Sequence, residues 1–487
     1  MRNTLLRETA LAFALGAMAA LGQAPWGLWF LSVPAFAALI WCVTTSGRPT
    51  LSAWLGGAGY FAVALSWIVE PFLIDAETYA WMAPFALFMM AFGLALFWAA
   101  AGYAGSRARR HPALAFALAL TLAELARGYV LTGFPWATPG HIWIGTPLDQ
   151  AAAYVGPNGL TLLTLLAASL PVAAYWRGTI AGLGLLGLVA AGGAWRLSIP
   201  LPPDRPSTLR LVQPNAEQRL KWDASRARTY LDSQLAMTAK APVADLTIWP
   251  ETAIPYLFED SPEVASLITD ASGGRPVALG IQRVEGQRFW NSLRVVQDAG
   301  DIVQTYDKYH LVPFGEYVPF GDLAQDWFGL TAFAARSGNS YSPGQGAAVL
   351  DLGPALGKVL PLICYEAVFP QDLRAAPERA DWILQITNDA WFGIRSGPFQ
   401  HAAQAALRAT EQGLPLIRVA NTGITQVIDA HGRVRSSLPF GTMGALDTTL
   451  PGALPPTPFV RWGEIPVLVL LAGLSLLTLR RKPRPMA

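Results

Sequence analysis

Charged residues are distributed unevenly along this 487-residue chain, and this distribution constrains the fold more than any other feature. Only 15 of the 68 Asp, Glu, Lys and Arg residues lie in residues 1–200. The whole chain has 14% charged residues, where soluble globular domains have about 25%. Such a chain is not disordered, and a purely soluble protein is not expected. The net charge of +2 argues against a nucleic-acid partner, which usually requires a strong basic excess.

Apolar stretches near both ends predict a polytopic bundle of membrane helices. A helix needs about 20 mostly apolar residues to cross a bilayer. About eight stretches approach that length, at residues 9–22, 26–43, 52–69, 82–104, 112–131, 159–176, 179–196 and 463–480. We therefore expect seven transmembrane helices within residues 1–200, a soluble domain at 205–455, and an eighth helix with a basic tail at 460–487.

Basic residues indicate which side of the membrane each short loop faces, because cytoplasmic loops carry an excess of Lys and Arg. With eight crossings, most basic residues of the short loops and tails fall on one side: Arg2, Arg7, Arg48, Arg107, Arg109, Arg110, Arg177, Arg480, Arg481, Lys482 and Arg484. The acidic loop at 70–77 falls on the other side. The domain at 205–455 lies between the last two crossings, so we expect it to face the periplasm from a bacterial inner membrane.

The hydrophobic pattern changes after the proline-rich linker at 199–206. Short apolar runs predict strands at 209–212, 245–249, 277–281, 290–297, 359–364 and 382–387. Two longer segments, 225–241 and 397–412, are predicted to be helices. Strands that alternate with helices indicate a layered α/β or α+β domain.

Glu251 is the first candidate for chemistry. It lies in Trp-Pro-Glu-Thr at 249–252, directly after an apolar strand. A carboxylate at a partly buried strand end has a raised proton affinity, which suits a general base. The alternative is a surface glutamate that begins a turn.

A second segment, at 306–316, combines charges and a histidine with aromatic residues and prolines. Lys308 is placed to stabilise an oxyanion, as cations do in acyl transfer, and Glu316 to assist or orient a base. The alternative for Lys308 is a solvated loop lysine. His310 is expected to be a hydrogen-bonded loop residue rather than a catalyst.

Cys364 ends an apolar strand and is followed by Tyr365 and Glu366. This layout presents a nucleophile at a sharp strand end, although a buried, inert cysteine is the common alternative. The only other cysteine, Cys42, lies in a predicted membrane helix and cannot pair with Cys364 across the bilayer. A lone thiol is a liability in an oxidising compartment, which favours a reactive role. Glu251 would deprotonate Cys364, and Lys308 would hold the oxyanion.

These motifs resemble those of a known family. Glu, Lys and Cys stand in the same order and settings as in the nitrilase, or carbon–nitrogen hydrolase, superfamily. The predicted spans and outer domain narrow the resemblance to the apolipoprotein N-acyltransferase family. Further segments that are similar lie at 133–136, 220–223, 387–393 and 418–423.

The resemblance implies an α-β-β-α sandwich joined to a membrane bundle, with Glu251 as base, Lys308 as oxyanion stabiliser and Cys364 as nucleophile. It implies supporting or substrate-binding roles for Glu316, Glu366, Tyr365 and Trp222. The implied reaction transfers an acyl chain from a phospholipid, usually phosphatidylethanolamine, to the N-terminal amine of a diacylglyceryl-cysteine on an apolipoprotein. It passes through a thioester on the cysteine.

Two other functions remain open from the residues alone. A membrane-tethered amidase or nitrilase would use the same three residues with water, and a lipid- or lipoprotein-binding protein would need no catalysis.

No metal, nucleotide or other cofactor is expected, because no ligand cluster or phosphate-binding glycine motif stands out. A monomer is expected, because no feature demands a partner subunit. The aromatic loop at 320–333 is a candidate membrane-interface segment, with packing inside the domain as the alternative. Glu124 and Arg127 are expected to pair, because charges within a membrane seldom stay alone.

Overall fold

A computed structural model of the protein describes residues 2–108, 110–221, 223–254, 262–319 and 340–479. The chain forms two compact units. The first comprises Met1–Pro200, Arg395–Leu407 and Pro456–Ala487, and the second comprises Leu201–Ile394 and Arg408–Pro455.

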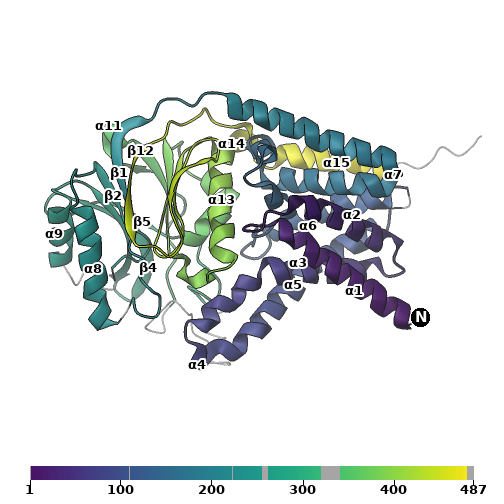
Figure 1. Ribbon diagram of the computed structural model, residues 1–487, viewed down its shortest axis with the longest axis horizontal. Coiled ribbons are helices and arrows are strands. Elements are labelled where there is room, and N and C mark those ends of the chain that lie inside the picture. Colours follow the sequence, from purple (N-terminus) through teal and green to yellow (C-terminus); the bar gives the residue numbers. More distant parts are fainter. Residues whose placement is uncertain (1, 109, 222, 255–261, 320–339, 480–487) are drawn as a thin grey trace, which may run out of the picture. The chain divides into compact units, whose positions relative to one another are not determined.

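The first unit is helical (Figure 1). Its α-helices are α1 (Arg2–Ala19), α2 (Trp29–Thr45), α3 (Pro49–Ala64), α4 (Ala76–Tyr79), α5 (Ala83–Gly105), α6 (Pro112–Arg127), α7 (Ala152–Ser198), α14 (Pro458–Trp462) and α15 (Ile465–Leu479). Shorter 3₁₀ helices connect them: η1 (Ala20–Gly22), η2 (Ser66–Leu73), η3 (Ala80–Met82), η4 (Pro139–Trp143) and η5 (Pro147–Ala151). Proline begins α3 and α6, where its fixed φ suits the first turn and its missing N–H costs nothing.

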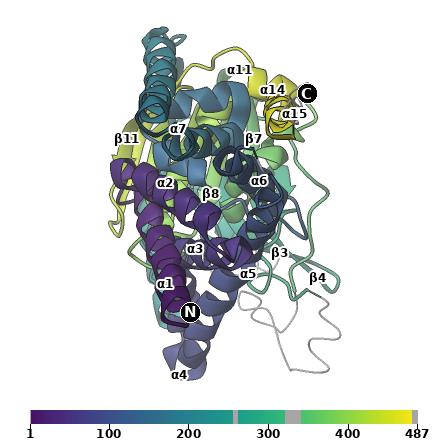
Figure 2. The same ribbon diagram turned by 90° about the vertical axis from the view of Figure 1, so that its right-hand side faces the viewer.

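Small residues allow close packing of α1 against α3, which lie side by side in Figure 2. A methyl group added to Gly16 would lie 1.8 Å from the carbonyl oxygen of Gly56. One added to Gly59 would lie 2.0 Å from the carbonyl oxygen of Phe13. The two backbones therefore touch, as at many helix contacts in membranes.

Helix α7 is a hairpin of two helices rather than one rod. Its backbone leaves the helical region at Ala174 (φ −142°, ψ 23°) and Tyr175 (φ 49°, ψ −130°). Beyond this break, a methyl group on Gly178 would lie 1.8 Å from the carbonyl oxygen of Leu170, so the chain folds back on itself. Two helices were predicted here, at 159–176 and 179–196, and the break falls within the last three residues of the first.

Two helical stretches of the described residues, Ala76–Gly105 and Pro147–Ser198, are each long and apolar enough to cross a membrane. A third is added if Pro49–Ala64 and Ser66–Leu73, bent by 48° at their junction, form one span. Trp29–Thr45 and Ile465–Leu476 are apolar but shorter. A helix is present at each predicted span, whereas the number of crossings stays a prediction.

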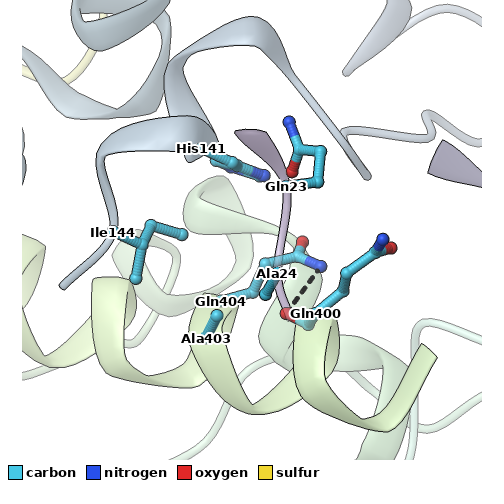
Figure 3. A pocket seen from close by; sticks show the side chains of 7 residues that line it. All are labelled: Gln23, Ala24, His141, Ile144, Gln400, Ala403 and Gln404. Carbon is cyan, nitrogen blue, oxygen red and sulfur yellow. Dashed lines mark hydrogen bonds between the residues drawn. The ribbon is translucent and has the colours of Figure 1, made fainter. Parts of the chain in front are cut away.

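A buried ion pair lies in this unit, between α6 residues Glu124 and Arg127. Arg127 donates to both carboxylate oxygens of Glu124, which confirms the expected pair. Trp98 Nε1 donates to the same carboxylate at 2.8 Å, and the guanidinium lies over the ring of Phe61. Figure 3 shows a small pocket in this unit, lined by Gln23, Ala24, His141, Ile144, Gln400, Ala403 and Gln404.

The second unit contains two six-stranded sheets. The first sheet has the order β12-β1-β2-β3-β4-β5, with β1 (Arg205–Gln213), β2 (Leu246–Ile248), β3 (Val277–Glu285), β4 (Arg288–Gln297), β5 (Asp301–Asp307) and β12 (Gly444–Leu450). The second has the order β11-β10-β9-β8-β7-β6, with β6 (Leu350–Asp351), β7 (Lys358–Ile363), β8 (Trp382–Thr387), β9 (Leu416–Ala420), β10 (Thr425–Ile428) and β11 (Val434–Leu438). Strands β1, β2 and β3 run parallel, as do β7, β8 and β9.

Helices α8 (Ala224–Thr238) and α9 (Pro262–Ala271) cover one face of the first sheet (Figure 1). Leu231 of α8 and Ile268 of α9 pack with Leu279 of β3 in one buried apolar cluster. The other face of this sheet meets the second sheet, where the side chain of Gln213 accepts a hydrogen bond from the backbone of Thr425 at 3.2 Å. The domain is therefore layered, with two sheets facing each other.

Among its described residues, this unit also has four short helices: α11 (Gly353–Leu356), η7 (Cys364–Val368), α12 (Pro370–Arg374) and η8 (Asp389–Phe392). Helix α13 (Gly397–Gln412) is shared by the two units, and Arg408–Gln412 belong to the second. The hydroxyl of Thr410 in α13 donates to the carbonyl oxygen of His431 at 3.1 Å.

Candidate active site

The three predicted catalytic residues each follow a strand of the second unit. Glu251 comes just after β2, and Lys308 directly follows β5, both in the first sheet. Cys364 directly follows β7 in the second sheet. Because the sheets face each other, residues that follow these strands meet across the interface, and ligands bind preferentially at such strand ends.

Cys364 is the first residue of η7, at a sharp turn directly after β7. Its φ of 52° is in the left-handed region, which is uncommon for a residue with a side chain. The carbonyl oxygen of Cys364 accepts a hydrogen bond from Gln385 at 3.1 Å, and the residue is 6% exposed. A strained, tightly held backbone position of this kind is typical of active sites.

Burial raises the pKa of the Cys364 thiol well above its ordinary value, and the negative charge of Glu251 raises it further. Lys308 and a hydrogen bond from Thr387 act in the opposite direction. The thiol therefore keeps its proton at neutral pH, and attack on a carbonyl requires a base that removes the proton during the reaction.

Lys308 is buried between two carboxylates. Its Nζ lies 2.9 Å from Glu316 and 4.0 Å from Oε1 of Glu251. Burial alone would lower the pKa of this lysine, but Glu316 and Glu251 outweigh burial and raise it. Lys308 is therefore a permanent cation, and the alternative of a solvated loop lysine is excluded by its exposure of 1%.

Glu251 is held by donors from both sheets. Asn291 Nδ2 of β4 donates to Oε1 at 2.7 Å, and the backbone N–H of Asn388, after β8, donates to Oε2 at 2.8 Å. The residue is 6% exposed, so it is not a surface glutamate. These bonds fix the carboxylate beside Lys308.

Glu316 is the second carboxylate that contacts Lys308, and it shares the Asn291 donor with Glu251. It accepts from Asn291 Nδ2 at 3.1 Å and from the backbone N–H of Val312 at 2.9 Å. Asn291 thus bridges Glu251 and Glu316, and both carboxylates approach the same ammonium. The position of Glu316 agrees with a supporting role.

Glu366 joins the loop after β5 to the turn that carries Cys364. Its Oε1 accepts from the hydroxyl of Tyr306 and the backbone N–H groups of Tyr309 and His310, at 2.8, 2.9 and 3.3 Å. Its Oε2 accepts from the backbone N–H of Ile363 at 2.7 Å. Burial raises the pKa of Glu366 to about 7, against the opposing effects of these donors and of Lys308.

Of the remaining predicted residues, Tyr365 is buried, and its ring packs edge-to-face against Phe369 and His310. Trp222 lies outside the described residues, as does the aromatic loop at 320–333. Neither prediction is tested by the structure.

Two contributors to this site were not predicted from the sequence. Asn291 lies in β4 and is 4% exposed, but β4 also contains the polar residues Ser292 and Arg294, so no sequence signal singled out this amide. Lys221, adjacent to Trp222, is 3% exposed, and its Nζ lies 3.3 Å from the carbonyl oxygen of Glu251. Burial lowers the pKa of Lys221 to about 8, although Glu251 opposes this shift.

The arrangement provides the elements of acyl transfer. It places a carboxylate, a permanent cation and a thiol at facing strand ends, and the electrostatic influence of both charged groups reaches the thiol. Within the described parts of the chain, no three His, Cys, Asp or Glu side chains are grouped to hold a metal ion.

Comparison with known proteins gives the family. Residues 15–170 match the family model described as "Apolipoprotein N-acyltransferase N-terminal domain", and residues 208–454 match "Carbon-nitrogen hydrolase". Among solved structures, a carbon–nitrogen hydrolase superfamily protein from Xanthomonas campestris aligns with a TM-score of 0.37 at 17% identity, covering 58% of this chain and 99% of that one.

Curated relatives align over nearly the whole chain. An apolipoprotein N-acyltransferase from Caulobacter vibrioides is 39% identical, covering 95% of this chain and 92% of the relative. Those from Bradyrhizobium diazoefficiens and Brucella melitensis are 36% and 37% identical, covering 98% and 96% of this chain and 95% and 94% of the relatives. The chain belongs to the apolipoprotein N-acyltransferase family of the carbon–nitrogen hydrolase superfamily.

Proposed function

We propose that this chain transfers an acyl chain from a phospholipid to the N-terminal amine of a diacylglyceryl-cysteine on an apolipoprotein, the last step of lipoprotein maturation. The observation that carries the proposal is the buried arrangement of Lys308, 4.0 Å from Glu251, beside the turn that begins at Cys364. Family membership over both units supports it.

In the first half-reaction, the sulfur of Cys364 attacks an ester carbonyl of the phospholipid. Glu251 takes the thiol proton, and the Lys308 ammonium stabilises the tetrahedral oxyanion. When the oxyanion collapses, the carbon–oxygen bond to glycerol breaks. The proton on Glu251 passes to the departing alkoxide, so that a lysophospholipid leaves and Cys364 carries the acyl chain as a thioester.

In the second half-reaction, the amine of the apolipoprotein attacks the thioester carbonyl. Glu251 accepts a proton from the amine, and Lys308 again stabilises the oxyanion. The carbon–sulfur bond breaks, an amide forms, and the proton returns to the sulfur of Cys364. Bonds and charges balance over the two half-reactions, and no step requires another reactant.

Supporting residues fit the same scheme. Glu316 anchors Lys308, and Glu366 ties the Lys308 loop to the Cys364 turn. Tyr365 and Trp222 are assigned to the substrate, with Tyr365 next to the nucleophile in sequence. Residues 205–455 would form the catalytic domain, between residues 1–200 with the first seven membrane helices and residues 460–487 with the last.

The membrane arrangement follows from the substrates. Both are amphiphiles held in a bilayer, so an enzyme with about eight crossings would present its catalytic domain to the outer surface of the bacterial inner membrane. The basic loops support this orientation. Phosphatidylethanolamine is the donor that we expect, and the working unit is a monomer.

A direct assay separates this function from amide hydrolysis. Purified protein is incubated with phosphatidylethanolamine and a synthetic diacylglyceryl lipopeptide, and the peptide mass is followed. We expect one acyl chain to be added by the wild type and none by Cys364→Ala. Release of ammonia from small amides without acylation of the peptide would establish an amidase instead. Full function of Cys364→Ala in cells would favour a lipid- or lipoprotein-binding protein instead.

A further inference from the structure

A second contact joins the two catalytic segments, outside the triad and its carboxylate partners. Nδ1 of His310 lies 2.8 Å from Oδ2 of Asp372. His310 stands two residues after Lys308, on the loop that leaves β5, and Asp372 lies in α12, soon after Cys364 and η7. The contact therefore links the segment that carries the cation to the segment that carries the nucleophile.

The imidazole ring of His310 is held on its face as well as at its edge. It is stacked on Phe369, with ring centroids 3.6 Å apart and planes 20° apart. Tyr365 meets both rings edge-on, at 5.9 Å from His310 and 4.9 Å from Phe369. The histidine thus packs directly against the residue that follows the nucleophile.

The same histidine is fixed through its backbone. Its N–H donates to Glu366 at 3.3 Å, beside the N–H of Tyr309 at 2.9 Å. The side chains of His310 and Asp372 are only 17% and 10% exposed, so water competes weakly for their hydrogen bond. His310 therefore connects the segment that carries Lys308 to the segment that carries Cys364 in three ways: through its backbone N–H, through the face of its ring and through the edge of its ring.

We propose that His310 and Asp372 are positioning residues, whose contact sets the separation of Lys308 from Cys364 for formation of the acyl-enzyme. This rests on the proposed function. An oxyanion donor must lie within hydrogen-bonding distance of the tetrahedral oxygen, and Lys308 and Cys364 belong to different sheets. A misplacement of about 1 Å can cost about 100-fold in rate.

The experiment measures the rate of thioester formation on Cys364 from phosphatidylethanolamine in the purified full-length protein. We expect His310→Ala and Asp372→Ala to lower the maximal acylation rate about 10- to 100-fold, with the KM for phospholipid changed less than about twofold. The double variant should be no slower than the slower single variant, because both remove one contact. Lys358→Ala, which removes an exposed ion pair with Glu378 in the same unit, is the control and should acylate normally.

Conservative variants separate positioning from general stability. His310→Asn retains a donor near the Nδ1 position, and Asp372→Asn retains an acceptor. On a logarithmic scale, each should therefore recover at least half of the acylation rate that the corresponding alanine variant loses. These variants also serve if an alanine variant does not fold. Wild-type acylation by folded His310→Ala would overturn the proposal, as would additive losses in the double variant or the absence of recovery by both asparagine variants. A wild type that forms no thioester would instead refute the proposed function itself.

Discussion

The side-chain amide of Asn291 lies 2.7 Å from Oε1 of Glu251, and the same nitrogen lies 3.1 Å from Glu316. This one buried donor spaces the two carboxylates that hold Lys308. Replacing it with an acid would place three carboxylates around one ammonium, and like charges at such distances destabilise one another strongly.

We therefore expect Asn291→Asp to lower the rate of thioester formation by about 100-fold, measured by the mass of the acylated protein with time. Gln297→Glu is the matched control, because it makes the same amide-to-acid change at the partly exposed end of the same strand. If Asn291→Asp acylates as fast as Gln297→Glu, the spacing role is wrong.

The pH dependence of Cys364 alkylation tests the electrostatics of the site. Burial and Glu251 raise the pKa of this thiol, and Lys308 lowers it. In a Cys42→Ala background, the midpoint of iodoacetamide alkylation should lie above the value of about 8.5 for an exposed cysteine.

The two neighbouring charges should then shift this midpoint in opposite directions. Glu251→Gln removes a like charge and should lower it, whereas Lys308→Met removes an opposite charge and should raise it. Asp270→Asn, on the exposed surface of α9, should leave it unchanged. Shifts of the reverse sign would contradict the described charge arrangement.

Lys221 should destabilise the protein at neutral pH. Its pKa is lowered by burial to about 8 in the folded state, from 10.5 when unfolded. The unfolded chain therefore binds more protons between these values, so the stability contribution of Lys221 improves as pH rises from 8 to 10.5.

Lys221→Met removes this penalty, which is on the order of 3 kcal/mol below pH 8. We expect the variant to melt at a higher temperature than the wild type at pH 7, with the difference shrinking toward pH 10. Lys240→Met, at an exposed lysine, should show no such trend. A constant difference across this pH range would exclude titration of Lys221 as its cause.

Labelling of single cysteines tests the expected orientation. The background is Cys42→Ala with Cys364→Ala, and the new cysteines are Gly47→Cys, Glu77→Cys and Met443→Cys, all at exposed positions. A membrane-impermeant maleimide should label positions 77 and 443 in intact cells, and position 47 only after the inner membrane is permeabilised. Labelling of 47 and 77 under the same condition would contradict the predicted crossings.

Much of the fold could be predicted from short segments of the sequence. The runs at 382–387 and 397–412 predict β8 and α13 with the bounds observed, because an apolar run and a helix-forming segment each end at a turn signal. Strand β11 was not predicted, since its Val-Arg-Ser-Ser-Leu sequence is largely exposed at a sheet edge and has no apolar pattern to reveal it.

The catalytic candidates were visible for the same local reason, since Glu251 and Cys364 each follow an apolar strand. Their surroundings were not visible. Asn388 donates to Glu251 across 137 residues of sequence, and Asn291 across 40. The packing of the two sheets determines such partners, and a short segment of sequence gives no information about that packing.

Formation of a thioester on Cys364 is measured by the mass of the peptide that contains this residue, after incubation of the protein with phosphatidylethanolamine alone. We predict that wild type gains the mass of one acyl chain as a hydroxylamine-sensitive thioester, that Lys308→Ala forms it about 10²- to 10³-fold more slowly, and that Cys364→Ala gains none. A wild-type protein that adds acyl chains to the lipopeptide while this peptide never gains acyl mass would contradict the account.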